Sequence, residues 1–267
     1  MSASRPVPLS SLPGDAARRV CGLLTDIDDT LTRDGRIEPE ALAALHDLRS
    51  AGVPVIAVTG RPMGWSRDFA ETWPLEAIVA ENGAVALFTD AGRLVTEYAQ
   101  DESTRATNAV RLKAAAERVL HEVPGSSLAR DSAGRVTDIA IDHSEFARLD
   151  PAQIAQVVAV MQAEGMNATV SSIHVNGWYG EHDKLSGARW IVGRRLGRVL
   201  DAETADWVYV GDSTNDQQMF GHFALSVGVA NLMQFAARLT TWPAYLTQSE
   251  RGAGFAEVAR RLVDARR

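Results

Sequence analysis

The sequence Asp26-Ile27-Asp28-Asp29-Thr30 is the part of this chain whose residue types are best suited to chemistry. Asp26 and Asp28 are two residues apart and directly follow an apolar run, so the end of a strand could aim both carboxylates at one point. Folding alone does not require three acids at the tip of a buried strand, and their repulsion would suppress ionisation unless a cation or a reaction needs them. The simpler alternative is a solvated acidic turn, because Asp favours turns and helix N-caps.

Polar residues also follow two other strand-like runs. Thr59-Gly60-Arg61 comes after the apolar run 53–58, and Gly211-Asp212-Ser213-Thr214-Asn215-Asp216 comes after the run 207–210. Ligands of open parallel sheets bind beyond the carboxyl ends of the strands, so we expect these loops to face a common crevice.

Four carboxylates would then meet in that crevice, from Asp26, Asp28, Asp212 and Asp216. Such a cluster repels itself without a cation, and Mg²⁺ is the natural choice because it binds carboxylate oxygens together with substrate phosphate.

Candidate phosphate-binding groups occur near the same strand ends. Thr59 and Gly60 offer a hydroxyl and exposed N–H groups at a strand-to-helix turn, which suits phosphate. Lys184 begins a predicted helix and is the best candidate for a cation that clamps phosphate, although an isolated Lys is more often a solvated surface charge.

The elements that must position these residues alternate between strand and helix. Apolar runs and helical spacing predict strands at 20–25, 53–58 and 77–80, with helices at 39–51 and up to residue 73. The alternation returns from Lys184, with a helix to Leu196, strands at 207–210, 224–229 and 244–247, and helices near 232–239 and 255–266. This order predicts an α/β fold with a Rossmann-like parallel sheet core.

The pattern changes in the middle of the chain. A β-hairpin is predicted at 84–88 and 93–98, followed by helices at 101–122 and 151–164 and strands at 137–142, 167–171 and 173–178. We therefore predict a core formed by residues 20–88 and 182–267, with an inserted α+β domain at 89–181. Residues 1–19 are expected to form a flexible N-terminal lead-in.

Composition limits the partners. The 267 residues carry a formal net charge of −7, which argues against nucleic acid or an anionic membrane as partner. Cys21 is the only cysteine, so no intrachain disulfide can form. No apolar run approaches the roughly 20 residues of a membrane span. We expect a cytoplasmic protein, monomeric or homodimeric.

Taken in order, the four polar motifs resemble those of the haloacid dehalogenase-like hydrolase superfamily. They are Asp26-Ile27-Asp28-Asp29-Thr30, Thr59, Lys184 and Gly211 to Asp216. The inserted domain resembles the type II cap of its sugar-phosphatase branch, which holds sucrose-phosphatase-like and mannosyl-3-phosphoglycerate-phosphatase-like enzymes. Asp29 departs from the pattern, because many relatives carry Gly there.

The resemblance implies roles for the motif residues. Asp26 would attack phosphorus and form an aspartyl-phosphate, and Asp28 would be the general acid and then the base. Mg²⁺ would be held by the Asp26 carboxylate, the Asp28 backbone carbonyl and Asp212, with Asp216 either a ligand or behind the ligands. The phosphoryl oxygens would be held by Thr59, Gly60, Lys184 and Asn215.

The substrate implied is a small phosphorylated metabolite, in particular a sugar phosphate, whose leaving group the inserted domain would select. Candidate substrate contacts are Arg61, Asn82, His174, Asn176 and Trp178. For the last three, a solvated sheet face with a core tryptophan is an equal alternative. We therefore predict a Mg²⁺-dependent phosphoric monoester hydrolase.

Two other functions stay open. A phosphosugar mutase of the same fold, similar to phosphomannomutase, would return the phosphoryl group to sugar. A receiver-like phospho-acceptor also uses an acidic cluster with Thr and Lys, but receiver domains are much shorter and lack the insertion.

Overall fold

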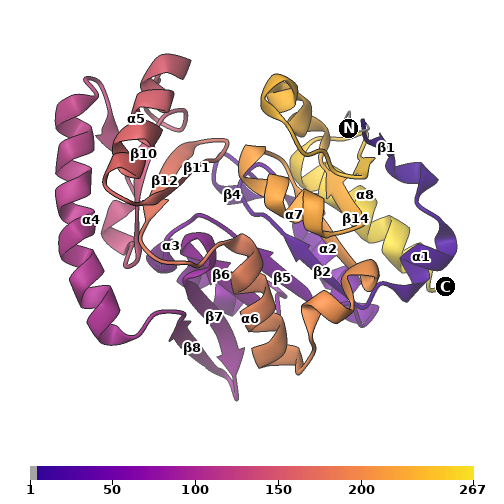
Figure 1. Ribbon diagram of the computed structural model, residues 1–267. Helices are drawn as coiled ribbons and strands as arrows, with labels where there is room; N and C mark the ends of the chain where they lie inside the picture. The colour runs from indigo at the N-terminus through magenta and orange to yellow at the C-terminus, as the bar shows by residue number, and fades with distance from the viewer. Residues whose placement is uncertain (1–4) are drawn as a thin grey trace.

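A nine-stranded sheet forms the centre of the computed structural model, which describes residues 5–267 (Figure 1). Its order is β1-β15-β14-β13-β2-β5-β6-β7-β8, and neighbouring strands from β1 to β6 are parallel. The strands are β1 (Val7–Pro8), β2 (Gly22–Thr25), β5 (Val55–Val58), β6 (Ala77–Ala80), β7 (Val85–Asp90), β8 (Arg93–Tyr98), β13 (Trp207–Gly211), β14 (Leu225–Gly228) and β15 (Tyr245–Leu246). The chain order reverses between β2 and β13, and ligands of open parallel sheets bind at the carboxyl ends of the strands at such a point.

Helices cover both faces of this sheet, which confirms the predicted α/β class. One apolar cluster packs α2 (Pro39–Ser50), α3 (Met63–Thr72) and α8 (Arg251–Asp264) on one face, and a second packs α6 (Lys184–Leu196) and α7 (Gln217–His222) on the other. The parallel strands read as continuous apolar runs because both of their faces are buried. The helix expected near 232–239 is instead the 3₁₀ helix η7 (Ala230–Arg238).

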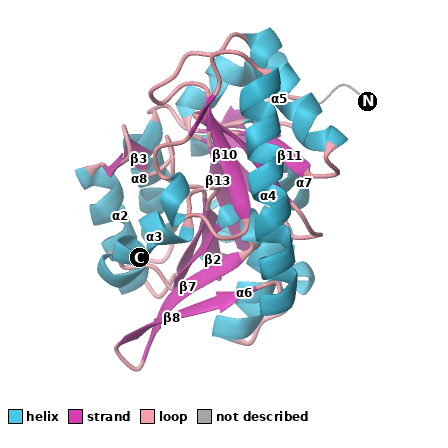
Figure 2. Ribbon diagram, turned by 90° about the vertical axis from the view of Figure 1, so that its left-hand side faces the viewer, coloured by secondary structure: helices cyan, strands magenta, loops and turns pink. Residues whose placement is uncertain are grey.

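A second, smaller unit lies beside the core, and we call residues 101–180 the insert (Figures 1 and 2). Its antiparallel sheet has the order β11-β12-β10-β9, formed by Asn167–Val170, His174–Trp178, Asp138–Asp142 and Ser127–Leu128. Helices α4 (Glu102–Glu122) and α5 (Pro151–Ala163) pack on it and share a separate apolar cluster. The insert is therefore an α+β unit with two helices against a small antiparallel sheet.

The structure differs from the predicted division at two points. Residues 1–4 lie outside the described part, but the rest of the predicted lead-in forms β1, the 3₁₀ helix η1 (Leu9–Ser11) and α1 (Gly14–Arg19), with Leu12 and Ala17 buried. Pro8 lies in the edge strand β1, and Pro13 is the N-cap residue of α1. The predicted boundary at residue 89 falls inside β7, because the β7–β8 hairpin extends the core sheet through pairing with β6.

Two short strands form a separate ribbon outside both sheets. The ribbon of β3 (Thr32–Arg33) and β4 (Arg36–Ile37) follows the acidic loop after β2. Among residues 5–267, no helix has the length and apolar character needed to cross a membrane.

Candidate active site

The carboxyl ends of β2 and β13 bring three acids and one lysine together. Asp26, Asp212 and Asp216 are at most 4% exposed, and each offers an oxygen within 4.8 Å of the others. The Lys184 ammonium, at the start of α6, donates to Asp26 Oδ1 and to Asp216 Oδ1, both at 2.7 Å. The loops after β2 and β13 therefore meet, and Lys184 lies among their acids with only 4% exposure.

Burial disfavours the ionised forms of Asp26 and Asp212. Burial raises the pKa of Asp26 to about 7, although the Lys184 charge opposes that rise. Burial, together with Asp216 and Asp26, raises the pKa of Asp212 well above its ordinary value. Asp212 Oδ1 is buried and accepts no hydrogen bond within the described chain. A buried oxygen without a partner, between other acids, fits a hard divalent cation.

Asp216 has a different environment, because both of its oxygens are already saturated. Oδ1 accepts from Lys184 and from the Tyr209 hydroxyl at 2.5 Å, and Oδ2 accepts the backbone N–H groups of Asp212 and Ser213 at 2.9 and 3.0 Å. A Cβ on Gly211 would lie 2.5 Å from the Asp216 carboxylate, so the strand end must be glycine. Of the two roles expected for Asp216, this environment favours a place behind the ligands.

Asp28 is held by an arginine and is absent from the three-acid cluster. The Arg61 Nε lies 3.0 Å from both Asp28 oxygens. The same guanidinium reaches across to the insert, where it donates to Asp131 at 3.1 Å and to Glu145 at 2.9 Å. The side chain of Arg61 is only 5% exposed. Three carboxylates therefore neutralise Arg61, which was expected to contact substrate.

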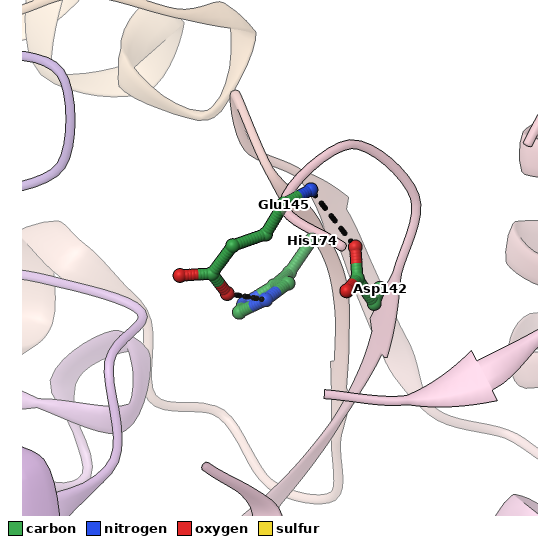
Figure 3. Close-up of side chains that lie close together, drawn as sticks. All are labelled: Asp142, Glu145 and His174. Carbon is green, nitrogen blue, oxygen red and sulfur yellow. Dashed lines mark hydrogen bonds and ion pairs between the residues drawn. The ribbon is translucent and has the colours of Figure 1, made fainter. Parts of the chain in front are cut away.

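A second cluster, in the insert, comprises two carboxylates and an imidazole, from Asp142, Glu145 and His174 (Figure 3). Asp142 accepts the backbone N–H groups of residues 144–147 with its two oxygens, so it caps a loop. One Glu145 oxygen accepts from Arg61 and the other lies 2.9 Å from His174 Nε2 (Figure 3). These carboxylates are already engaged, so the group is a structural network. His174, expected at substrate, belongs to it.

The loop after β5 carries Thr59 and Gly60. Thr59 is fully buried, and its hydroxyl oxygen accepts the backbone N–H of Arg61 at 3.0 Å. The Gly60 carbonyl accepts from Arg135 at 2.9 Å and from Asn176 at 3.2 Å, both in the insert.

The other predicted substrate contacts lie at the seam between core and insert. Asn82 and Asn176 donate to Asp138 at 3.2 and 3.1 Å, and both are 2% exposed. Trp178 is 3% exposed and donates its indole N–H to the His182 carbonyl at 2.8 Å. Asn215, expected at phosphate, is half-buried and accepts from the Ser213 hydroxyl at 2.7 Å.

A cleft of about 1110 Å³ opens between the core and the insert. Its walls include Asp28 and Arg61 from the core and Glu145 and Phe146 from the insert. Asn82, His174, Asn176 and Trp178 are not part of these walls. Asn82 and Asn176 donate to Asp138, His174 pairs with Glu145, and Trp178 donates to the His182 carbonyl.

Several residues at the site were not expected from the sequence. Tyr209 lies within an apolar strand and gives no signal of its own. Asn231 donates to Asp212 at 3.4 Å and to the Asp29 carbonyl at 2.9 Å, and it directly follows the strand β14 and a short apolar turn. Arg135 and Asp138 come from the insert, so only the tertiary fold brings them near Gly60. Asp29 pairs with Arg251 at 2.8 Å, outside the cluster.

Comparison with known proteins agrees with this arrangement. A family model described as haloacid dehalogenase-like hydrolase matches residues 23–121. The chain is 26% identical over 248 residues to a phosphoglycolate phosphatase of Methanopyrus kandleri, covering 91% of this chain and 97% of that protein.

Solved structures share the fold. A sucrose-phosphatase from Synechocystis, in complex with sucrose and phosphate, has a TM-score of 0.64 at 18% identity and covers 92% of this chain and 98% of its own. The C-terminal domain of a trehalose-6-phosphate phosphatase from C. albicans has a TM-score of 0.69 at 14% identity. The match covers 98% of this chain and 99% of that domain.

The sheet and the insert thus define an α/β fold that is shared with these two solved phosphatases. In sequence, the chain is similar to the haloacid dehalogenase-like hydrolases over residues 23–121 and to phosphoglycolate phosphatases over most of its length. The predicted enzyme class, a phosphoric monoester hydrolase, is confirmed, because the relatives of this chain are named phosphatases.

Proposed function

We propose that this protein is a Mg²⁺-dependent phosphatase that hydrolyses a small phosphomonoester through an aspartyl-phosphate on Asp26. The observation that carries this proposal is the buried Asp26–Lys184–Asp212 cluster at the point where the strand order reverses. A carboxylate there can reach phosphorus only if positive charge offsets its repulsion from phosphate. Lys184 supplies one such charge.

The carboxylates of this cluster are also suited to hold a divalent metal ion. Asp26 and Asp212 would hold Mg²⁺, because the Asp212 Oδ1 has no partner and Lys184 occupies only one Asp26 oxygen. Bound Mg²⁺ would supply positive charge that screens phosphate from the attacking carboxylate. Asp216 would keep Lys184 and the Asp212 backbone in place through its saturated oxygens.

The remaining steps belong to protein side chains. An Asp26 oxygen would form a bond to phosphorus as the bond to the leaving alcohol breaks, and Asp28 would give that alcohol a proton. Asp28 would then take a proton from the water that cleaves the aspartyl-phosphate. Because Arg61 holds both Asp28 oxygens, this ion pair must open before Asp28 can transfer a proton.

The cleft suggests which substrates to try first. It has room for a sugar phosphate, the class expected from the resemblance. Two exposed arginines in its walls, Arg148 and Arg238, have no ion-pair partner among residues 5–267. A second anionic group on the substrate would be attracted to them, so phosphoglycolate, named for the curated relatives, is a second candidate.

Release of inorganic phosphate from a panel of sugar phosphates, phosphoglycolate and nucleotides, with Mg²⁺, tests the proposal. We expect turnover that disappears in Asp26→Asn and after exhaustive EDTA treatment, with return of activity on added Mg²⁺. Near-normal turnover in Asp26→Asn would remove that residue from the nucleophile role. Formation of an isomeric hexose phosphate without phosphate release would favour the mutase, and activity on nucleotides alone would contradict the sugar assignment.

A further inference from the structure

The loop that holds Thr59 and Gly60 is fixed by the insert as well as by the core. Arg135 Nη1 donates to the Gly60 carbonyl at 2.9 Å, and Asn176 Nδ2 donates to the same oxygen at 3.2 Å. Both side chains are 2% exposed. These bonds join parts of the chain that are 75 and 116 residues apart.

Arg135 and Asn176 are themselves held by a buried acid. Arg135 donates to both oxygens of Asp138, at 2.8 and 2.9 Å, and Asn176 donates to Asp138 Oδ2 at 3.1 Å. The side chain of Asp138 is fully buried. Charged and amide groups held this way have little freedom to turn away from the Gly60 carbonyl.

The neighbouring backbone is also locked. A Cβ on Gly64 would lie 2.8 Å from the Gly134 Cα, so the insert loop rests directly on the start of α3. Glu81 joins the two sides, because it accepts the N–H of Met63 at 2.9 Å and that of Thr137 at 2.6 Å. The insert loop is therefore fixed against the core beside the Thr59–Gly60 loop.

One peptide group links these contacts of the insert to the Thr59 side chain. The peptide between Gly60 and Arg61 is trans and planar, so its carbonyl and its N–H point in opposite directions. The Gly60 carbonyl accepts hydrogen bonds from the insert, so the Arg61 N–H points the other way, at the Thr59 hydroxyl oxygen, 3.0 Å away. That bond occupies one lone pair of the Thr59 oxygen and so fixes the side chain, and the hydroxyl hydrogen, which donates to no group within residues 5–267, is available to donate.

We propose that Arg135 and Asn176 are positioning residues, which fix the Gly60–Arg61 peptide and so aim the Thr59 hydroxyl as a donor to substrate phosphate. The insert then does more than select the leaving group, because it completes the phosphate-binding loop. This inference rests on the proposed function, in which Thr59 holds a phosphoryl oxygen.

The test measures binding of inorganic phosphate to the full-length protein with Mg²⁺ by titration calorimetry, so that it does not depend on turnover. Asn176→Ser removes a donor to Gly60, and we expect the dissociation constant to rise about tenfold, the size of one lost hydrogen bond. Arg135→Lys keeps the charge beside Asp138 but loses the planar guanidinium, and we expect a rise in the same direction.

Asn167→Ser is the matched control. Asn167 is an exposed amide on the neighbouring strand β11, and it donates to the Gly180 carbonyl at 2.6 Å without touching Gly60. We expect its phosphate affinity to stay within about twofold of wild type.

Wild-type affinity in Asn176→Ser and Arg135→Lys, with only lowered thermal stability, would show a structural role alone and overturn the inference. In that outcome phosphate release by the wild-type protein would still support the proposed function. A wild-type protein that neither binds phosphate nor releases it from any substrate would overturn both.

Discussion

Replacing Lys184 by methionine tests the electrostatic account of the site most directly. Lys184 is 4% exposed and lies 2.7 Å from one oxygen each of Asp26 and Asp216. Burial works against its charge, yet Asp216 and Asp26 hold its pKa above the ordinary value. Methionine fills a similar volume but leaves two buried carboxylates without their cation. Removing one partner of a buried pair costs about 3–5 kcal/mol, and we expect a loss of that size in the free energy of unfolding at pH 8.

The assay is urea unfolding of Lys184→Met and wild type at pH 8 and pH 5, in EDTA so that no added metal compensates. The loss should shrink at pH 5, because burial raises the pKa of Asp26 to about 7 and its protonated carboxyl group no longer needs a cation. Arg189→Met is the control on the same helix, since Arg189 pairs with Asp201 at 3.0 Å in an exposed position and should change stability by less than about 1 kcal/mol. A loss in Lys184→Met no larger than in Arg189→Met, or one independent of pH, would refute the reasoning.

Other consequences concern the same cluster. Burial raises the pKa of Asp26 from 3.8 to about 7, so the folded state holds that proton more tightly and metal-free stability falls as pH rises from about 4 to 7. At about 1.4 kcal/mol per pKa unit, Asp26→Asn should be more stable than wild type by up to about 4 kcal/mol at pH 8 in EDTA, and equal stability by thermal unfolding would contradict this. Tyr209→Phe removes the 2.5 Å hydrogen bond to Asp216 and should cost about 1–3 kcal/mol, whereas Tyr245→Phe should cost little because no described hydrogen bond involves its hydroxyl.

The sequence was sufficient for the core because its signals are local. Short apolar runs predicted β2, β5 and β6, and helical spacing after Pro39 predicted α2. The edges of the units were harder to predict. Whether the β7–β8 hairpin belongs to the core or to the insert depends on pairing with β6, and that pairing leaves no trace in the hairpin sequence itself.

The candidate site divides in the same way. Asp26, Lys184 and Asp212 meet because each follows or begins an element whose place in a parallel sheet is set by topology. The polar residues of β12 could not be assigned from alternation alone. His174 and Asn176 do share one face of the strand, but their partners Glu145 and Asp138 come from other segments of the insert.

By itself, the sequence determined the α/β core, the insertion and the acids at the strand ends, because periodicity and strand-end chemistry act over a few residues. Only the tertiary structure decided what each group does with its remaining oxygens and protons. It saturates Asp216, leaves Asp212 Oδ1 without a partner and holds Asp28 on Arg61. It also turns Asn176 from the cleft to the Gly60 carbonyl. Most of these choices depend on hydrogen bonds between segments 30 to more than 100 residues apart, which local spacing does not encode.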